Sequence, residues 1–230
     1  MLRFIARPYE NLRIRYSVLF FALLIWLFLP YVLPANIERF VMAAAMVFLL
    51  FSALAASADT VRGFRIGVVL FVPVAVTWFA PEFMALSLVP FSRAFSVVFF
   101  GYVGIALLRH VIRAREVDAE ILFGAACVYL FFALVWGLLY ELVETVQPGS
   151  LAIGGRPLVA GEDFGTSIMY FSFVTLTTLG YGDIAPIGQF ARVLAMLEAV
   201  LGQLFMVLLV ARLVGVHTAQ AMSTAPAEER

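Results

Sequence analysis

Charged residues are scarce in this sequence of 230 residues. They make up 13% of it, against 64% hydrophobic residues. A soluble globular domain has roughly a quarter of its residues charged, so the composition excludes that class of protein. The basic and the acidic residues number 15 each and cancel to a formal net charge of zero, which gives no sign of a nucleic-acid partner.

Lysine is absent, and cysteine and histidine are rare. The single cysteine, Cys127, cannot form an intrachain disulfide and lies in an apolar run, as a small buried hydrophobic residue would. No metal-ligand spacing of His or Cys occurs, and no nucleophile motif. We therefore expect neither an enzyme nor a cofactor.

Long hydrophobic runs fill most of the chain. An α-helix needs about 20 apolar residues to cross the hydrocarbon core of a membrane. Six runs qualify as spans, although the third is short and contains Pro73. They cover residues 16–33, 40–56, 66–80, 90–108, 119–143 and 190–215. The sequence predicts an all-α integral membrane protein with six transmembrane helices.

The arginines indicate which loops lie in the cytoplasm, because short cytoplasmic loops carry the excess of positive charge. Arginines cluster before the first predicted span, after the second and after the fourth. This alternation predicts a multi-pass protein of the cell membrane with both termini cytoplasmic. It places residues 147–186 on the outer side.

Residues 164–183 form the segment whose residues point most directly to a function. The first part favours a helix of about 13 residues, roughly 20 Å long and too short to cross the membrane. The segment must therefore enter and return on the same side. Non-helical backbone at membrane depth has to line a cavity or be buried in protein, so the residues after Thr177 should face a pore.

The spacing of Gly180 and Gly182 suggests how that backbone is arranged. Carbonyl groups of a strand normally point to alternate sides, and a row that points one way needs unfavourable dihedral angles at every second residue. With glycine at these positions, the carbonyls of residues 178–181 and the hydroxyl of Thr178 would form a ladder of oxygen atoms for a monovalent cation. One chain supplies one wall of such a site, so four copies are needed, in a homotetramer or with relatives.

This segment resembles the signature of potassium channels. The residues that carry the resemblance are Thr175, Thr177, Thr178, Gly180, Tyr181, Gly182 and Asp183. It implies a selectivity filter of Thr178, Leu179, Gly180, Tyr181 and Gly182, with K⁺ as transported ion bound at the first four. Leu179 departs from the Val or Ile of many members, but the carbonyl group is unchanged.

The resemblance covers residues 119–215 and implies a division of the chain. Residues 1–116 would be a four-helix transmembrane module without voltage-sensor arginines. Residues 117–216 would be the pore domain, and 217–230 a short cytoplasmic tail. The expected partners are potassium ions, the lipid bilayer and further copies of the same chain.

Several residues are candidates for supporting the filter. By resemblance, Tyr170 would hydrogen-bond Asp183 at the outer mouth, with plain aromatic packing as the alternative. Glu198 lies within the last span, on a face that should point to the pore helix, where Ser172, Thr175 or Thr177 could hydrogen-bond it. Its alternative is a purely structural acid.

The last span also has candidates for the cavity and for gating. By resemblance Gly202 lies where the inner helix of the family often bends, and its alternative is close helix packing. Ala199, Gln203, Met206 and Val210 recur on one stripe, either lining a water-filled cavity or making ordinary helix contacts.

Other functions remain open at this point. A potassium transporter subunit would use similar loops, although usually four in one chain, and a regulatory membrane subunit would not conduct at all. A scaffold or a membrane enzyme would need features that the sequence does not show.

We expect opening to depend only weakly on voltage. A voltage sensor carries Arg at every third position and moves roughly three to four charges per subunit past acidic partners. The fourth span has Arg93 near its start and no further charge until Arg109. Because Glu38, Asp59 and Glu82 lie in loops, we expect Arg93 to have no acidic partner on the neighbouring spans.

The test is a conductance–voltage curve in symmetric potassium for the wild type and Arg93→Gln. Both curves should be shallow, with well under about one gating charge per subunit. A steep sigmoid that flattens in the variant would show that the fourth span is a sensor.

Overall fold

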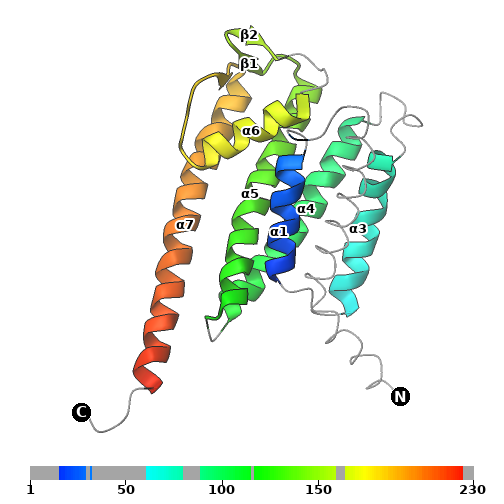
Figure 1. The fold of residues 1–230 in the computed structure, drawn as a ribbon. Coiled ribbons are helices and arrows are strands. Elements are labelled where there is room, and N and C mark those ends of the chain that lie inside the picture. Colours follow the sequence, from blue (N-terminus) through cyan, green and yellow to red (C-terminus); the bar gives the residue numbers. More distant parts are fainter. Residues whose placement is uncertain are drawn as a thin grey trace.

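The computed structural model describes residues 16–29, 32, 61–79, 89–114, 117–158 and 164–224. In chain order the helices are α1 (Tyr16–Phe28), α3 (Val61–Phe79), α4 (Val89–Arg113), α5 (Ala119–Val146), α6 (Phe164–Leu176) and α7 (Gln189–Thr224) (Figure 1). Three short strands join them, β1 (Leu151–Ile153), β2 (Arg156–Pro157) and β3 (Ile184–Pro186). The predicted second span, 40–56, lies outside the described residues.

Three of the described helices are long and apolar enough to cross a membrane. They are Val89–Arg113, Ala119–Val146 and Gln189–Gln220, with shorter apolar helices at Tyr16–Phe28, Arg65–Val74 and Phe164–Leu176. Six spans therefore remain a prediction. The last helix continues to Thr224, past position 216 where the sequence analysis ended the pore domain.

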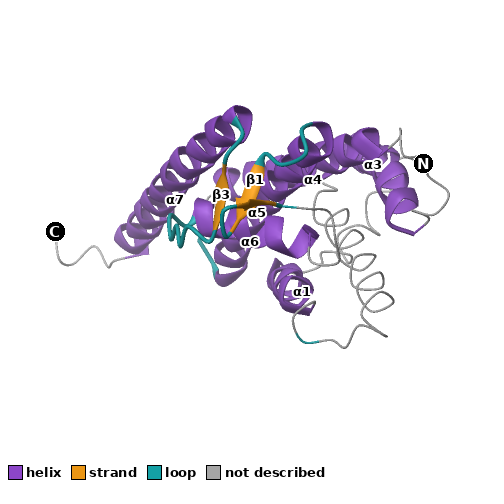
Figure 2. Ribbon diagram, turned by 90° about the horizontal axis from the view of Figure 1, so that it is seen from above, coloured by secondary structure: helices purple, strands orange, loops and turns teal. Residues whose placement is uncertain are grey.

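Helix α5 is the central element of the fold. Its first turn is capped by Asp118, whose carboxylate accepts the backbone N–H of Ile121 at 2.8 Å. No proline interrupts its 28 residues. Seen from above, α5 lies between α3 and α4 on one side and α6 and α7 on the other (Figure 2), and it contacts α1, α4, α6 and α7.

Aromatic and aliphatic side chains fill the interface between α4 and α5. Phe99 and Phe131 are fully buried there, and Phe100 packs between them with ring centroids 5.3 Å from Phe99 and 6.0 Å from Phe131. Between helices of this apolar character, close van der Waals packing of such side chains stabilises the contact. This interface attaches the first helices to the rest of the chain.

A small antiparallel sheet corrects the prediction that the fold is all-α. The strand order is β2-β1-β3, and the turn between β1 and β2 is Gly154–Gly155. Both glycines have positive φ, at 56° and 79°, which is what a two-residue hairpin turn of type I′ requires. The Gly-Gly pair is a hairpin signal that was not used in the sequence-based prediction.

The sheet is held to the end of α5 by a buried carboxylate. Glu144 accepts the backbone N–H of Gly149 at 2.8 Å and that of Leu151. The carbonyl of Ser150 accepts the N–H groups of Ile187 and Gly188, both at 2.9 Å. These bonds fix where β3 leaves the sheet to begin α7.

Candidate functional site

The segment between α6 and β3 has the alternating backbone that its glycines predict. Gly180 has φ of 57° and Gly182 of 79°. Thr178 also has positive φ, at 58°, and is the one non-glycine residue with that geometry in the described part of the chain. The sequence analysis missed it because a β-branched residue resists this conformation, typically at about 1–3 kcal/mol.

The first residues of the segment are attached to the last turn of α6. The N–H of Thr178 donates to the carbonyl of Thr175 at 3.0 Å. The N–H groups of Leu179 and Gly180 share the carbonyl of Val174, at 2.9 and 3.3 Å. Helix α6 thus ends directly at the segment, and the C-terminal end of a helix carries partial negative charge that favours a cation.

The carbonyl groups of residues 178–181 are left without backbone partners. No backbone hydrogen bond from another described residue reaches them. Their side chains leave the segment open as well, since Leu179 is 56% and Tyr181 67% exposed in the single chain. In Figure 1 this segment is drawn on the side of α7 away from α1, α3 and α4. A row of free carbonyls on an open face can coordinate a cation.

The C-terminal end of the segment is held at Asp183. The Tyr170 hydroxyl donates to the Asp183 carboxylate at 2.9 Å, which is the bond expected for this pair. The sequence analysis missed a second link, in which the N–H of Gly154 donates to the Asp183 carbonyl at 3.0 Å. The hairpin turn and α6 therefore hold this residue from two directions.

Glu198 is fully buried and connects three helices. Its Oε1 lies 2.6 Å from the Ser172 hydroxyl on α6, and its Oε2 accepts the Tyr140 hydroxyl of α5 at 2.7 Å. Ser172 was among the expected partners, whereas Thr177 donates instead to the carbonyl of Phe173 at 2.7 Å. The sequence analysis missed Tyr140 because nothing in the apolar pattern of α5 indicates which face meets α7.

The predicted cavity stripe lies on an open face of α7. Gln203, Met206 and Val210 are exposed, and Ala199 is half-buried. Glu198 is turned away from this stripe toward α6, as the helical offset predicts. The open face fits either a cavity wall or a contact with another chain, so the lining role remains a prediction.

Gly202 makes close contact with the end of α6. A β-carbon at this position would lie 2.4 Å from Leu176 Cδ1 and 3.1 Å from the Leu176 carbonyl. The packing interpretation of this glycine therefore has direct support. Helix α7 runs unbroken through it, and the hinge remains a prediction.

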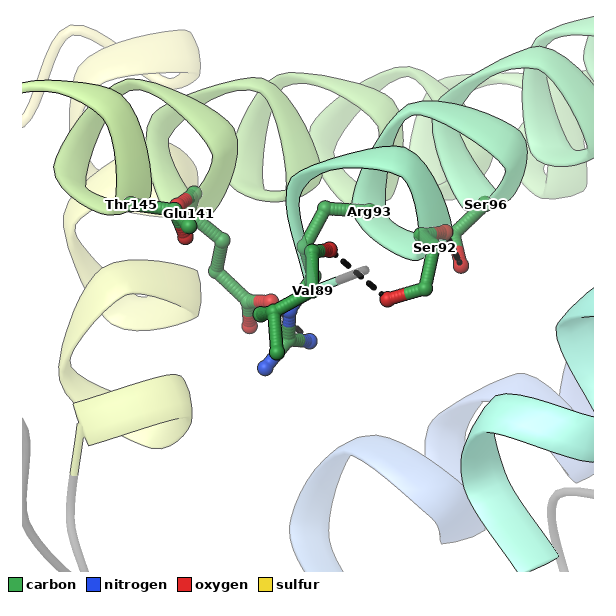
Figure 3. A network of polar contacts seen from close by, with 6 residues as sticks. All are labelled: Val89, Ser92, Arg93, Ser96, Glu141 and Thr145. Carbon is green, nitrogen blue, oxygen red and sulfur yellow. Dashed lines mark hydrogen bonds and ion pairs between the residues drawn. The ribbon is translucent and has the colours of Figure 1, made fainter. Parts of the chain in front are cut away.

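Arg93 does have an acidic partner, so that expectation was wrong. Its guanidinium forms an ion pair with Glu141 of α5 (Figure 3). The acids considered as partners lie in the loops of the first four spans, whereas Glu141 lies within the fifth predicted span, 119–143. The ion pair joins α4 to α5 near the start of α6.

Comparisons with known proteins agree with this geometry. Residues 125–218 match the family described as "Ion channel". The matched part is 94 of the 230 residues, less than half of the chain, and over this part the chain is similar to an ion-channel domain. The match includes most of α5 and α7, with α6 and the open segment between them. Three described helices are long and apolar enough to cross a membrane, which together with this match indicates a membrane protein.

One curated relative is the inward rectifier potassium channel Kirbac3.1 of Paramagnetospirillum magnetotacticum. The two are 34% identical over 73 residues, which is 32% of this chain and 20% of the relative. The chain thus matches about a fifth of that protein's length. No solved structure matches the chain.

Gly202→Ala should destabilise the packing of α7 on α6, because its β-carbon would overlap Leu176. Overpacking of this kind typically costs about 1–3 kcal/mol. Gly215→Ala is the matched control on the same helix, since nothing lies within 4 Å of its β-carbon. We expect the control to be neutral or to gain about 0.5–1 kcal/mol. Thermal unfolding in detergent measures both, and equal stability of the two variants would contradict the packing role.

Proposed function

We propose that this chain is one subunit of a potassium-selective channel that conducts passively across the cell membrane. The observation that carries the proposal is the alternation of positive φ at Thr178, Gly180 and Gly182, with the intervening carbonyls free of backbone partners. Rings of backbone carbonyls that replace the hydration shell are how potassium channels select their ion. The ion-channel domain and the potassium-channel relative support the same function.

In this proposal the selectivity filter consists of residues 178–182. Potassium would be coordinated by the carbonyls of Thr178, Leu179, Gly180 and Tyr181. Leu179 would leave coordination unchanged, because only its carbonyl takes part. Thr175, Thr177, Tyr170, Asp183 and Glu198 would support the filter from behind, and the stripe of α7 would line the cavity below it.

The assembly would be a homotetramer with the pore on its axis. A single chain presents one row of carbonyls, so it surrounds no ion, and four rows are required. The large exposed apolar face of α7, where Leu204, Val207 and Leu208 are each more than half exposed, supports contact with further copies or with lipid.

The topology of the proposal keeps six spans and cytoplasmic termini. Helix α6 and the filter would then enter from the outer side, with the β-sheet above them. Opening would depend weakly on voltage, since Arg93 is paired with Glu141 and a sensor charge has to leave its partner to move.

The proposal predicts a strong preference for potassium over sodium. Reversal potentials measured in a reconstituted bilayer, with potassium on one side and sodium on the other, should lie far from zero. Their sign should be the one expected when potassium is the more permeant ion. Gly180→Ala should abolish conduction, because a β-carbon resists the positive φ observed there. Gly215→Ala should conduct as the wild type does. A reversal potential near zero would contradict selectivity, and flux that saturates at slow turnover would favour a transporter.

A further inference from the structure

The ion pair between Arg93 and Glu141 lies outside the filter and takes no part in the proposed coordination of the ion. Figure 3 shows the two side chains pointing toward each other across the contact of α4 with α5. The Glu141 side chain is 8% exposed and that of Arg93 is 34% exposed. The pair is therefore shielded on the Glu141 side and only partly open on the other.

Each charge of the pair is unfavourable alone. A buried carboxylate without a partner pays a large desolvation penalty. Arg93 lies close to the beginning of α4 at Val89, where the helix end carries partial positive charge and disfavours a cation. No acidic residue occupies the first turn of α4 to offset this. In the ion pair each charge offsets the desolvation penalty of the other. Neutralising one side chain leaves an unpaired charge, so it should disturb this contact more than neutralising both.

The carboxylate of Glu141 also lies against the first turn of α6. A β-carbon added to Gly165 would be 3.4 Å from Glu141 Oε1, so the carboxylate fills the space beside this glycine. The N-terminal end of a helix carries partial positive charge and favours a nearby anion. One carboxylate is thus paired with a cation of α4 and lies beside Gly165 in the first turn of α6.

Helix α6 connects Gly165 in its first turn to the open segment that follows its last turn. It is a single helix of 13 residues, and the carbonyls of Val174 and Thr175 in its last turn hold Thr178, Leu179 and Gly180. A tilt of the first turn would move these acceptors and the backbone attached to them.

We propose that Arg93 is a positioning residue for the ion site, acting through Glu141 on the orientation of α6. The N-terminal helices would then hold the filter in its selective geometry, which gives residues 1–116 a function that voltage sensing does not supply. The inference rests on the proposed function, because it concerns the selectivity of that same site.

The test compares variants of the full chain reconstituted in liposomes. Arg93→Gln leaves the buried carboxylate unpaired, Glu141→Gln removes the acid, and the double variant removes both charges. Arg109→Gln is the matched control, since it neutralises an exposed arginine of the same helix. The readouts are the potassium-to-sodium permeability ratio and, in parallel, the midpoint of thermal unfolding.

We expect Arg93→Gln to lower the permeability ratio about tenfold, because the unpaired carboxylate moves away from α6 to find solvent. The double variant should recover to within about threefold of the wild type, and Arg109→Gln should match the wild type. If Arg93→Gln does not fold, the permeability ratios of the double variant and of Glu141→Gln are compared instead. A double variant that folds and is more selective than Glu141→Gln supports the coupling.

Three results would overturn the inference. In the first, Arg93→Gln is as selective as Arg109→Gln. In the second, the double variant is as defective as the worse single variant. In the third, the unfolding midpoint falls while the permeability ratio stays constant, which would make the pair purely structural. A wild type that passes sodium as well as potassium overturns the proposed function itself, and so the two failures are distinguishable.

Discussion

The helices and the sheet meet around one constraint, a short irregular backbone segment that the surrounding elements have to hold in place. Residues 178–181 receive no backbone hydrogen bond from the described residues, and alternate positions have positive φ. Such a segment has no secondary structure of its own to keep it in place. It has to be held at both ends and from behind by groups that are themselves fixed.

The groups that hold this segment in place come from α5, α6, α7 and the hairpin. The last turn of α6 holds the start of the segment, while Tyr170 and the Gly154 turn hold Asp183 at the other end. Behind it, Glu198 joins α7 to Ser172 on α6 and Tyr140 on α5. Buried polar groups are costly unless every one is paired, and here the pairs cross between helices, so they specify one arrangement of the three.

Local features of the site were predictable from the sequence, and contacts between distant residues were not. The short helix 164–176, the positive φ of Gly180 and Gly182 and the bond from Tyr170 to Asp183 follow from residue type, spacing and resemblance. Tyr140 and Glu141 were missed because residues 121–139 of α5 are apolar on all sides, and periodicity cannot orient such a stretch of helix. The hairpin had a local signal that went unused. The number of spans, the assembly and the cavity depend on residues or chains beyond those described, and they stay predictions.

The central claim is that four copies of residues 178–182 together bind potassium through their backbone. Native mass spectrometry of the purified chain in mild detergent, heated stepwise in potassium or in sodium salt, tests it directly. The account predicts a four-chain species that survives to a higher temperature in potassium, because an ion that binds only the assembled form stabilises it. A monomer or dimer, or a tetramer that dissociates at the same temperature in both salts, would contradict it.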